Sequence, residues 1–234
     1  MTGKEEYVRG IFNAIAPRYD LLNTILSFNC DRRWRRFTVA QTGLKPGYKA
    51  LDVCCGTGML SLELARAVAP DGQVVGLDFS PRMLEIASSR LANDPNGHLV
   101  RLVEGNAIDL PFPDNSFDCA TIAFGLRNLP DIKKGLAEMR RVVRPGGRVV
   151  SLELAKPTLP FFKQLYYLYF DYLVPLIGRL GVGLDGPYSY LPRSLKGYPH
   201  QAEILQYFRE LGLDNARYFE LTGGIVAVHV GIKR

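Results

Sequence analysis

The stretch that decides the fold of this 234-residue chain is Leu51-Asp52-Val53-Cys54-Cys55-Gly56-Thr57-Gly58-Met59-Leu60-Ser61. Its apolar beginning is typical of a buried strand, and residues 59–68 have the pattern of a helix. Gly56 and Gly58 predict a tight turn between the two, where the backbone can approach a ligand at a helix N-terminus. This order indicates a nucleotide-like cofactor site, although a GxG pair also occurs in plain strand-to-helix turns.

Strands and helices alternate after this stretch. We expect strands at residues 50–54, 73–78, 98–104, 117–123 and 147–154, and helices at 59–68, from 81 and at 131–143. Such alternation predicts right-handed crossovers and a mostly parallel sheet. Residues 213–220 and 224–231 then alternate like a closing antiparallel hairpin. The expected fold is a doubly wound, Rossmann-like α/β fold with a seven-stranded sheet and helical caps.

The two remaining segments have a different character. Residues 1–45 are mixed and helical, and we expect them to form an N-terminal cap before a main domain at 46–234. Residues 156–199 predict an inserted cap, which is apolar and aromatic at 161–177 and rich in Gly, Pro and Tyr at 178–199. Its aromatic part suits packing on the sheet or a wall for a lipid tail.

Composition excludes several classes. Hydrophobic residues make up 47% and charged residues 22%, which excludes a disordered chain or a coiled coil. We find no apolar run of about 18–20 residues and no export signal, so we expect a cytoplasmic protein. The four cysteines have no zinc-type spacing, so we expect reduced thiols and no metal. The net charge of +6, with a basic run at 32–36, permits an acidic partner such as nucleic acid or anionic lipid.

Two acids sharpen the interpretation of the glycine stretch. Asp78 ends the second strand, 20 residues after Gly58, where an acid accepts hydrogen bonds from ribose hydroxyls. Ser61 stands where a dinucleotide-binding fingerprint has its third glycine or alanine. Asp52 precedes the turn and would repel a pyrophosphate. A carboxylate there suits a cofactor with an amine and a sulfonium, and S-adenosylmethionine is such a cofactor.

An adenine site is expected after the third strand. Asn106 is suited to hydrogen-bond an adenine edge, and Ala107 leaves room for the ring. Phe79 and Met83 are candidates to pack against that ring. The alternatives are a turn Asn that bonds its local backbone and a Met83 that only packs in the core.

Separate motifs resemble one enzyme family. Residues 52–58, Asp78, Asn106-Ala107 and the RPGG run at 144–147 resemble class I S-adenosylmethionine-dependent methyltransferases. More narrowly, four further motifs resemble the C-methyltransferases of menaquinone and ubiquinone biosynthesis: residues 19–23 followed by Ser27 and Trp34, residues 124–128, residues 141–147 followed by Glu153, and residues 222–229. The match spans nearly the whole chain. Two departures are Cys54, at the middle glycine of the general loop, and Ala123, where some members have a Ser near the cofactor.

The resemblance implies a reaction and a set of site residues. It implies transfer of a methyl group from S-adenosylmethionine to a ring carbon of demethylmenaquinol, which gives menaquinol. The catalytic residues would be Arg127, Asn128 and Tyr19. The cofactor-binding residues would be Asp52, Gly56, Thr57, Gly58, Asp78, Phe79, Met83, Asn106, Ala107 and Ala123. Tyr188, Tyr190 and His200 are candidates to contact the substrate, although His200 also stands at an expected helix N-terminus.

Several alternatives stay open. In the rival interpretations, the enzyme methylates the benzoquinol of the ubiquinone pathway, or both quinols, or another lipid phenol. The expected partners are a prenylated naphthoquinol and, transiently, the inner face of the cell membrane; a homodimer stays open. An RNA-binding methyltransferase is a rival of another class, suggested by the positive charge. The sequence lacks the aromatic and basic strand motif of RNA-recognition modules, so we expect no nucleic-acid partner.

Overall fold

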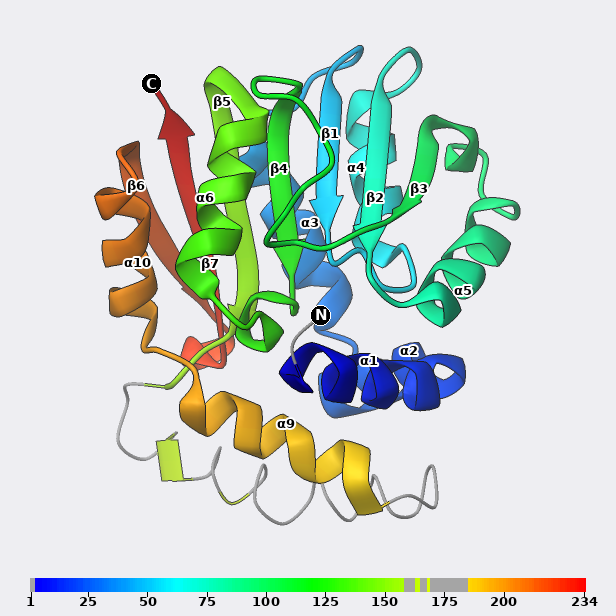
Figure 1. Cartoon of the computed structure of the whole chain (residues 1–234), viewed down its shortest axis with the longest axis vertical. Helices are drawn as coiled ribbons and strands as arrows, with labels where there is room; N and C mark the ends of the chain where they lie inside the picture. Colours follow the sequence, from blue (N-terminus) through cyan, green and yellow to red (C-terminus); the bar gives the residue numbers. More distant parts are fainter. Residues whose placement is uncertain (1–2, 158–162, 165–167, 169–184) are drawn as a thin grey trace.

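One sheet of seven strands organises the molecule (Figure 1). The computed structural model describes residues 3–157, 163, 164, 168 and 185–234, without the side chains of 4, 185–189 and 191. The strand order is β3-β2-β1-β4-β5-β7-β6. The strands are β1 (Lys49–Val53), β2 (Gln73–Asp78), β3 (Val100–Glu104), β4 (Phe117–Ala123), β5 (Val143–Leu154), β6 (Leu213–Leu221) and β7 (Val226–Lys233).

The pairing confirms the predicted fold class. Strands β1 to β5 pair in parallel, and β7 runs antiparallel to both β5 and β6. The order reverses beside β1, so the carboxyl ends of β1 and β4 diverge where ligands bind in open α/β sheets. Strand β3 starts at Val100 rather than His98, because residues 97–99 form a short 3-10 turn first.

Helices cover both faces of the sheet. Helices α3 (Asp31–Thr42) and α4 (Met59–Val68) lie behind it in Figure 1, and α6 (Ile132–Val142) and α10 (Gln201–Glu210) lie in front. Helix α5 (Pro81–Leu91) lies along the β3 edge. The apolar side chains facing α6 and α10 form a larger cluster than those facing α4. Burying both faces is what stabilises a parallel sheet.

Local chemistry explains where these helices begin and end. Ser80 caps α5 through its Oγ, which accepts a hydrogen bond from the backbone N–H of Met83 at 3.2 Å, and Pro81 takes the first helical position. Gly43 ends α3 in the left-handed conformation with φ 69°. The start of α5 at Pro81 agrees with the predicted start of a helix at residue 81.

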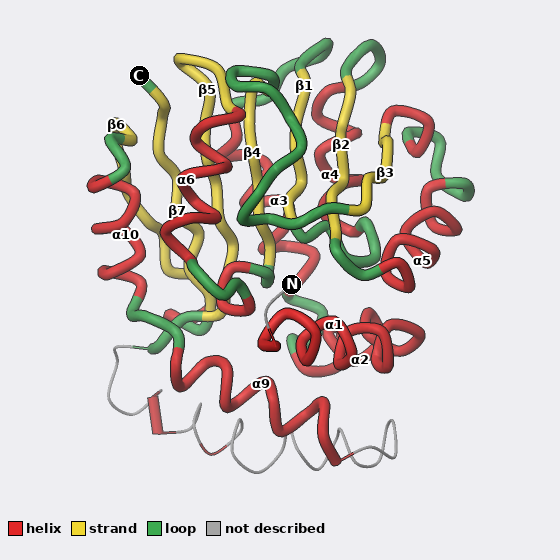
Figure 2. The backbone as a smooth tube through the Cα atoms, in the orientation of Figure 1, coloured by secondary structure: helices red, strands yellow, loops and turns green. Residues whose placement is uncertain are grey.

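Two helices of the N-terminal region lie across the carboxyl edge of the sheet. Figure 2 shows α1 (Gly3–Ile15) and α2 (Tyr19–Leu26) below the ends of β1 and β2, joined by a 3-10 turn, with α9 (Asp185–Gly197) farther out. Helix α3 instead packs against the sheet, where Trp34 joins the apolar cluster of β5 and β7. The boundary of the cap at residue 45 stays a prediction.

Part of the aromatic cap is outside the described structure. Of the predicted apolar segment 161–177, residues 163, 164 and 168 are described. In the ranges that the structure covers, no helix is both long enough and apolar enough to span a membrane.

Candidate active site

The glycine turn, residues 54–58, bends the chain sharply between β1 and α4. Cys54, Gly56 and Gly58 all have positive φ values, at 55°, 55° and 78°. For Cys54 this conformation costs about 1–2 kcal/mol relative to a right-handed one. Gly125 makes room for it, because a Cβ at that position would lie 2.6 Å from Cys54 Cβ. The turn therefore brings backbone to the edge of the sheet with little side chain in the way.

Two small cavities open on either side of this turn. One, of about 30 Å³, is lined by residues of the turn together with Tyr19, Arg35 and Asp52. The other, of about 50 Å³, is lined by Phe79, Asn106, residues of α1 and residues of the segment between β4 and α6. Cys54 lines both cavities. The two cavities therefore form one discontinuous site along the carboxyl edge.

Asp52 is a buried carboxylate beside the first cavity. Its side chain accepts hydrogen bonds from the hydroxyls of Ser61 at 2.6 Å and Thr121 at 3.1 Å. Burial raises its pKa to about 7, while these two hydroxyls and the charge of Arg35 lower it. A carboxylate that is hard to ionise alone is stabilised in its charged form by a cation nearby.

Asp78 is the second buried carboxylate. It accepts backbone hydrogen bonds from Gly56 and Ser80, both at 2.9 Å, and so ties the glycine turn to the start of α5. Burial raises its pKa to about 6, and the backbone N–H groups oppose that rise. Two acids at this edge suit a ligand that carries a cation and a ribose diol.

Helices α1 and α2 close over this edge through polar contacts. Glu5 accepts a hydrogen bond from Asn106 Nδ2 at 2.9 Å, so one of the predicted adenine-binding groups meets α1. Asp20 accepts a hydrogen bond from Thr57 Oγ1 at 2.7 Å and forms an ion pair with Arg90. The N-terminal helices thereby contact both halves of the site.

A cluster around Arg127 lies beside the turn. We call Tyr19, Arg127, Asn128, Glu153 and Tyr190 the arginine cluster. Arg127 Nη1 donates to Glu153 Oε1 at 2.7 Å, and their side chains are 6% and 1% exposed. Burial lowers the pKa of Arg127 and the Glu153 carboxylate raises it, with a net rise. Among the described residues, Arg127 Nε is buried without a hydrogen-bond partner.

The tyrosines of the cluster are neutral at physiological pH. Tyr190 donates its hydroxyl hydrogen bond to Asn128 Oδ1 at 3.0 Å. Burial raises the pKa of both Tyr19 and Tyr190, and the nearby Arg127 charge opposes the rise. Arg127 thus acts electrostatically on both hydroxyls from the centre of the cluster.

The predicted site residues divide into those that line a cavity and those that do not, and Asp78, Arg127 and Tyr190 are in the second group. Nine of them line one of the two cavities: Tyr19, Asp52, Gly56, Thr57, Phe79, Asn106, Ala107, Ala123 and Asn128. Gly58 caps α4 behind the turn, and Met83 is 2% exposed in the core. His200 caps α10, where its Nδ1 accepts a hydrogen bond from the N–H of Ala202 at 3.2 Å. Tyr188 lies in α9 with its side chain outside the described structure.

Several lining residues were not predicted. Arg35 lines the first cavity, and Glu5, Val8 and Phe12 of α1 line the second. The spacing of Asp31 and Arg35, four apart on a helix, was an available signal for a buried ion pair. Glu5, Val8 and Phe12 are spaced i, i+3 and i+7, which places them on one face of a helix but does not indicate what that face covers.

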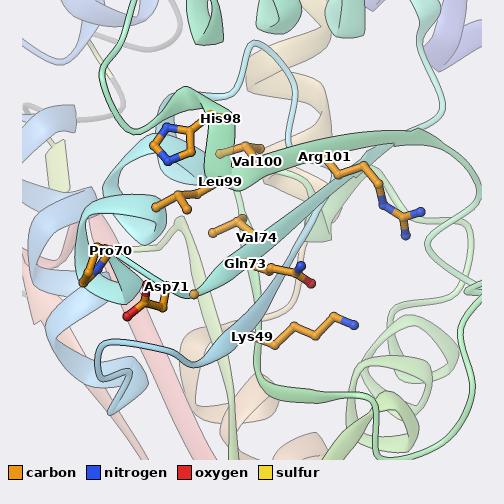
Figure 3. A pocket seen from close by; sticks show the side chains of 10 residues that line it. Lys49, Pro70, Asp71, Gln73, Val74, His98, Leu99, Val100 and Arg101 are labelled. Atoms are coloured by element: carbon orange, nitrogen blue, oxygen red, sulfur yellow. The ribbon is translucent and has the colours of Figure 1, made fainter.

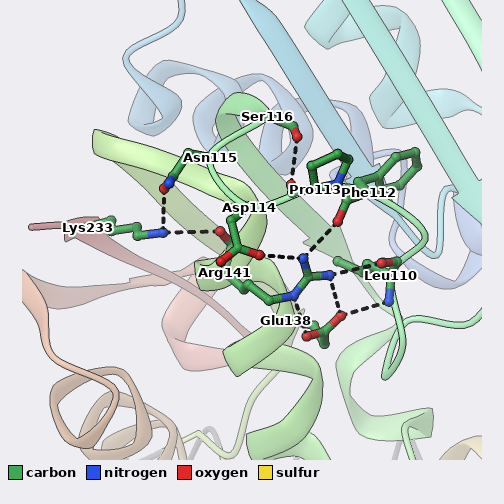
Figure 4. Close-up of polar contacts among 9 residues, drawn as sticks. All are labelled: Leu110, Phe112, Pro113, Asp114, Asn115, Ser116, Glu138, Arg141 and Lys233. Atoms are coloured by element: carbon green, nitrogen blue, oxygen red, sulfur yellow. Dashed lines mark hydrogen bonds and ion pairs between the residues drawn. The ribbon is translucent and has the colours of Figure 1, made fainter.

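The signature at 141–147 has a structural part. Figure 4 shows Arg141, from the predicted signature at 141–147, between α6 and the loop at 110–116. Its guanidinium bonds Glu138 and Asp114 and donates to the backbone carbonyls of Leu110 and Phe112 at 2.9 and 2.7 Å. The motif here holds a loop to a helix at a distance from the glycine turn.

A wider groove lies at the opposite edge of the sheet. Figure 3 shows it at the amino ends of β1, β2 and β3, near Lys49, Gln73 and Val100, with a volume of about 610 Å³. It contains none of the predicted site residues. Ligands of parallel sheets bind at the carboxyl edge, so the smaller cavities are the candidate site. No group of three potential metal-ligating side chains occurs among the residues described.

The fold and the glycine turn define a class I S-adenosylmethionine-dependent methyltransferase. The chain is similar to a solved methyltransferase of Aquifex aeolicus, with a TM-score of 0.63 and 20% identity over 86% of this chain and 89% of that one. It is also similar to phosphoethanolamine N-methyltransferase 2 of Haemonchus contortus, solved with S-adenosylmethionine, with a TM-score of 0.61 and 16% identity over 85% of this chain and 52% of that one. These likenesses establish the fold.

Within this class, the sequence matches one family over nearly its full length. Residues 1–233 match the model of the ubiE/COQ5 methyltransferase family, and the chain belongs to that family. It is 51% identical to the demethylmenaquinone methyltransferase of Desulfitobacterium hafniense over 98% of this chain and 91% of that one. It is 46% identical to the enzyme of the same name from Staphylococcus aureus (strain JH9), over 98% and 94%.

Proposed function

We propose that this protein transfers the methyl group of S-adenosylmethionine to a ring carbon of demethylmenaquinol and so forms menaquinol. The observation that carries the proposal is the similarity at 46–51% identity to two demethylmenaquinone methyltransferases over nearly the whole chain. Bound S-adenosylmethionine supplies an electrophilic methyl group on a sulfonium. The residues of the chain then have to bind, orient and exclude water.

The glycine turn and its two acids form the proposed cofactor site. Gly56, Thr57 and Gly58 present backbone at the start of α4, Asp52 faces the cationic end, and Asp78 accepts from the ribose hydroxyls. Phe79, Met83, Asn106 and Ala107 form the proposed adenine site, and Ala123 lines the methionine side. The division of the site into two cavities that meet at Cys54 supports this assignment.

The arginine cluster forms the proposed quinol site. Loss of the phenolic proton places negative charge on the quinol oxygen and on the ring carbon beside it. Arg127 stabilises that oxygen, and its buried, unpartnered Nε supplies a donor for it. Asn128, held by Tyr190, orients the oxygen or a water, and Tyr19 closes the site. Tyr188 and His200 remain proposed substrate contacts.

The test is a methyl-transfer assay with two quinols. Purified protein and S-adenosylmethionine are incubated with reduced demethylmenaquinol or with the demethylated benzoquinol of the ubiquinone pathway. We expect mass spectrometry to show one added methyl on the naphthoquinol ring. Product from both would make the enzyme bifunctional, and product from the benzoquinol alone or from neither would contradict the proposal.

We also propose that the enzyme works at the cytoplasmic face of the membrane that holds its substrate. Leu21, Ile25 and Phe28 are 61%, 45% and 78% exposed, and the exposed Arg32 and Arg33 follow them. Apolar side chains beside basic ones suit an anionic lipid surface. We expect co-flotation with vesicles containing anionic lipid and weaker flotation of Phe28→Ser. Equal flotation with zwitterionic vesicles would contradict the electrostatic part.

Light scattering of the same preparations would show whether the protein is a monomer or the homodimer that the sequence left open.

A further inference from the structure

Arg35 is a buried arginine inside the candidate site. It lies on α3, in the basic run at 32–36, where the other arginines, Arg32, Arg33 and Arg36, are exposed. Arg35 itself is 6% exposed and lines the cavity beside the glycine turn. A buried charge is costly unless it is paired and hydrogen-bonded. Arg35 therefore does not belong to the solvated face of a basic helix, and its burial needs another explanation.

One side of the guanidinium is fixed by Asp31. Arg35 Nη1 donates to Asp31 Oδ2 at 2.5 Å, and both side chains are at most 7% exposed. Asp31 also accepts a hydrogen bond from Ser27 Oγ at 3.2 Å. The guanidinium carbon lies 5.4 Å from the centre of the Phe124 ring, which restricts its movement on another side. The guanidinium is therefore held in place before any ligand arrives.

The other side of the guanidinium has N–H groups that are available to a ligand. A guanidinium has five N–H groups, and within the described structure Arg35 uses Nη1 alone for hydrogen bonds. The cavity that Arg35 lines also contains Asp52, Gly56 and Thr57. Its positive charge lowers the pKa of Asp52 and of Tyr19, which line the same cavity. One small space thus combines the carboxyl group of Asp52 with a cationic donor group.

These observations match one end of the cofactor. The methionine moiety of S-adenosylmethionine carries an ammonium and a carboxylate on the same carbon. We propose that Arg35 binds that carboxylate, while Asp52 serves the cationic groups. A planar guanidinium matches the two oxygens of a carboxylate better than an ammonium does. The inference rests on the cofactor site proposed above and adds the residue that selects for the amino-acid end.

The test compares two ligands that differ in this carboxylate. Isothermal titration calorimetry measures the binding of S-adenosylmethionine and of its decarboxylated analogue to the full chain. We expect the wild type to prefer S-adenosylmethionine about 10- to 100-fold, as for a charge-assisted hydrogen bond. In Arg35→Gln combined with Asp31→Asn, which leaves no unpaired buried acid, the preference should fall to within about threefold.

Control variants separate this role from folding and from general electrostatics. Arg36→Gln removes a charge from the same helix at an exposed position and should keep the wild-type preference. Arg35→Lys keeps the charge without the fork and should lose part of the preference. A wild type that binds both ligands equally, or a double variant that keeps the wild-type preference, overturns the inference. A wild type that binds neither ligand overturns the proposed cofactor site itself.

Discussion

The glycine turn and the arginine cluster lie side by side at one edge of the sheet and are built differently. Residues 54–58 and Asp78 belong to a single strand-helix-strand unit, and a backbone hydrogen bond from Gly56 to Asp78 joins them. The arginine cluster draws Tyr19, Arg127, Glu153 and Tyr190 from four distant segments, and its contacts are between side chains, as in the buried pair of Arg127 and Glu153. The contrast predicts that the cofactor is held mainly by local structure, with Arg35 of α3 as the exception, and that the rate of methyl transfer depends on tertiary packing.

Removing Arg127 should have the largest effect. In Arg127→Met we expect methyl transfer to fall about 100- to 1,000-fold, as when a donor to a developing oxyanion is lost. The free energy of unfolding should fall by about 3–5 kcal/mol, because Glu153 is left buried and unpaired. Urea titration and steady-state kinetics measure the two effects.

The matched control is Arg127→Met with Glu153→Gln. This double variant should regain most of the lost stability and remain slow, while the Kd for S-adenosylmethionine stays within about twofold of the wild type. Wild-type turnover in either variant would remove Arg127 from the mechanism.

The buried acid of the glycine turn should give stability a distinct pH dependence. Folding raises the pKa of Asp52 from 3.8 to about 7, so the folded state binds its proton more tightly than the unfolded state. This contribution to stability is full below pH 3.8 and is lost as the pH rises to about 7. Relative to Asp52→Asn, the wild type should lose about 4 kcal/mol across that range. Parallel curves for the two proteins in urea titrations at several pH values would contradict the prediction.

Changing the second acid should affect cofactor affinity rather than the rate of methyl transfer. We expect Asp78→Asn to raise the Kd for S-adenosylmethionine about 10- to 100-fold, since a charged acceptor for the ribose is lost. The rate from the saturated complex should stay close to that of the wild type. Calorimetry and single-turnover kinetics separate the two, and Asp71→Asn at the opposite edge is the control. A large loss of rate at saturating S-adenosylmethionine would contradict the division of roles between the two regions.

A change in the backbone of the turn should have the smallest effect. Gly58 has φ +78°, and a Cβ there would lie 3.3 Å from Ala87 Cβ. Gly58→Ala should therefore lower the free energy of unfolding by about 1–2 kcal/mol. Gly10→Ala, in α1 with open space around the new Cβ, should not destabilise the protein. Equal thermal unfolding of Gly58→Ala and the wild type would show that the turn relaxes without cost.

The sequence predicts the first region better than the second, for a physical reason. Strand, glycine turn, helix and acid follow each other in the chain, so periodicity and spacing indicate them directly. Arg35 escaped prediction because a run of arginines is typical of a solvated helix face. Its inward position depends on how α3 docks, since Nε1 of the neighbouring Trp34 donates to Thr222 Oγ1 at 2.9 Å in the turn between β6 and β7.

The second region required resemblance as well as pattern. Arg127 and Asn128 were expected at the site from a family motif, whereas the contact of Glu153 with Arg127 depends on two strands pairing. In the same way, α1 lines the cavity beside Phe79 and Asn106 only because the N-terminal helices fold back over the carboxyl edge of the sheet. Such placements arise from tertiary packing, which local pattern does not encode.

The most direct test of the central claim is a single-turnover experiment on the redox state of the substrate. The protein is preloaded with S-adenosylmethionine carrying a radiolabelled methyl group and mixed with demethylmenaquinol or with oxidised demethylmenaquinone. If the ring carbon of the reduced quinol is the nucleophile and Arg127 stabilises its oxyanion, label should pass to the quinol in the wild type and not to the quinone. Transfer to both at equal rates, or transfer to the quinol at the wild-type rate in Arg127→Met, would contradict the account.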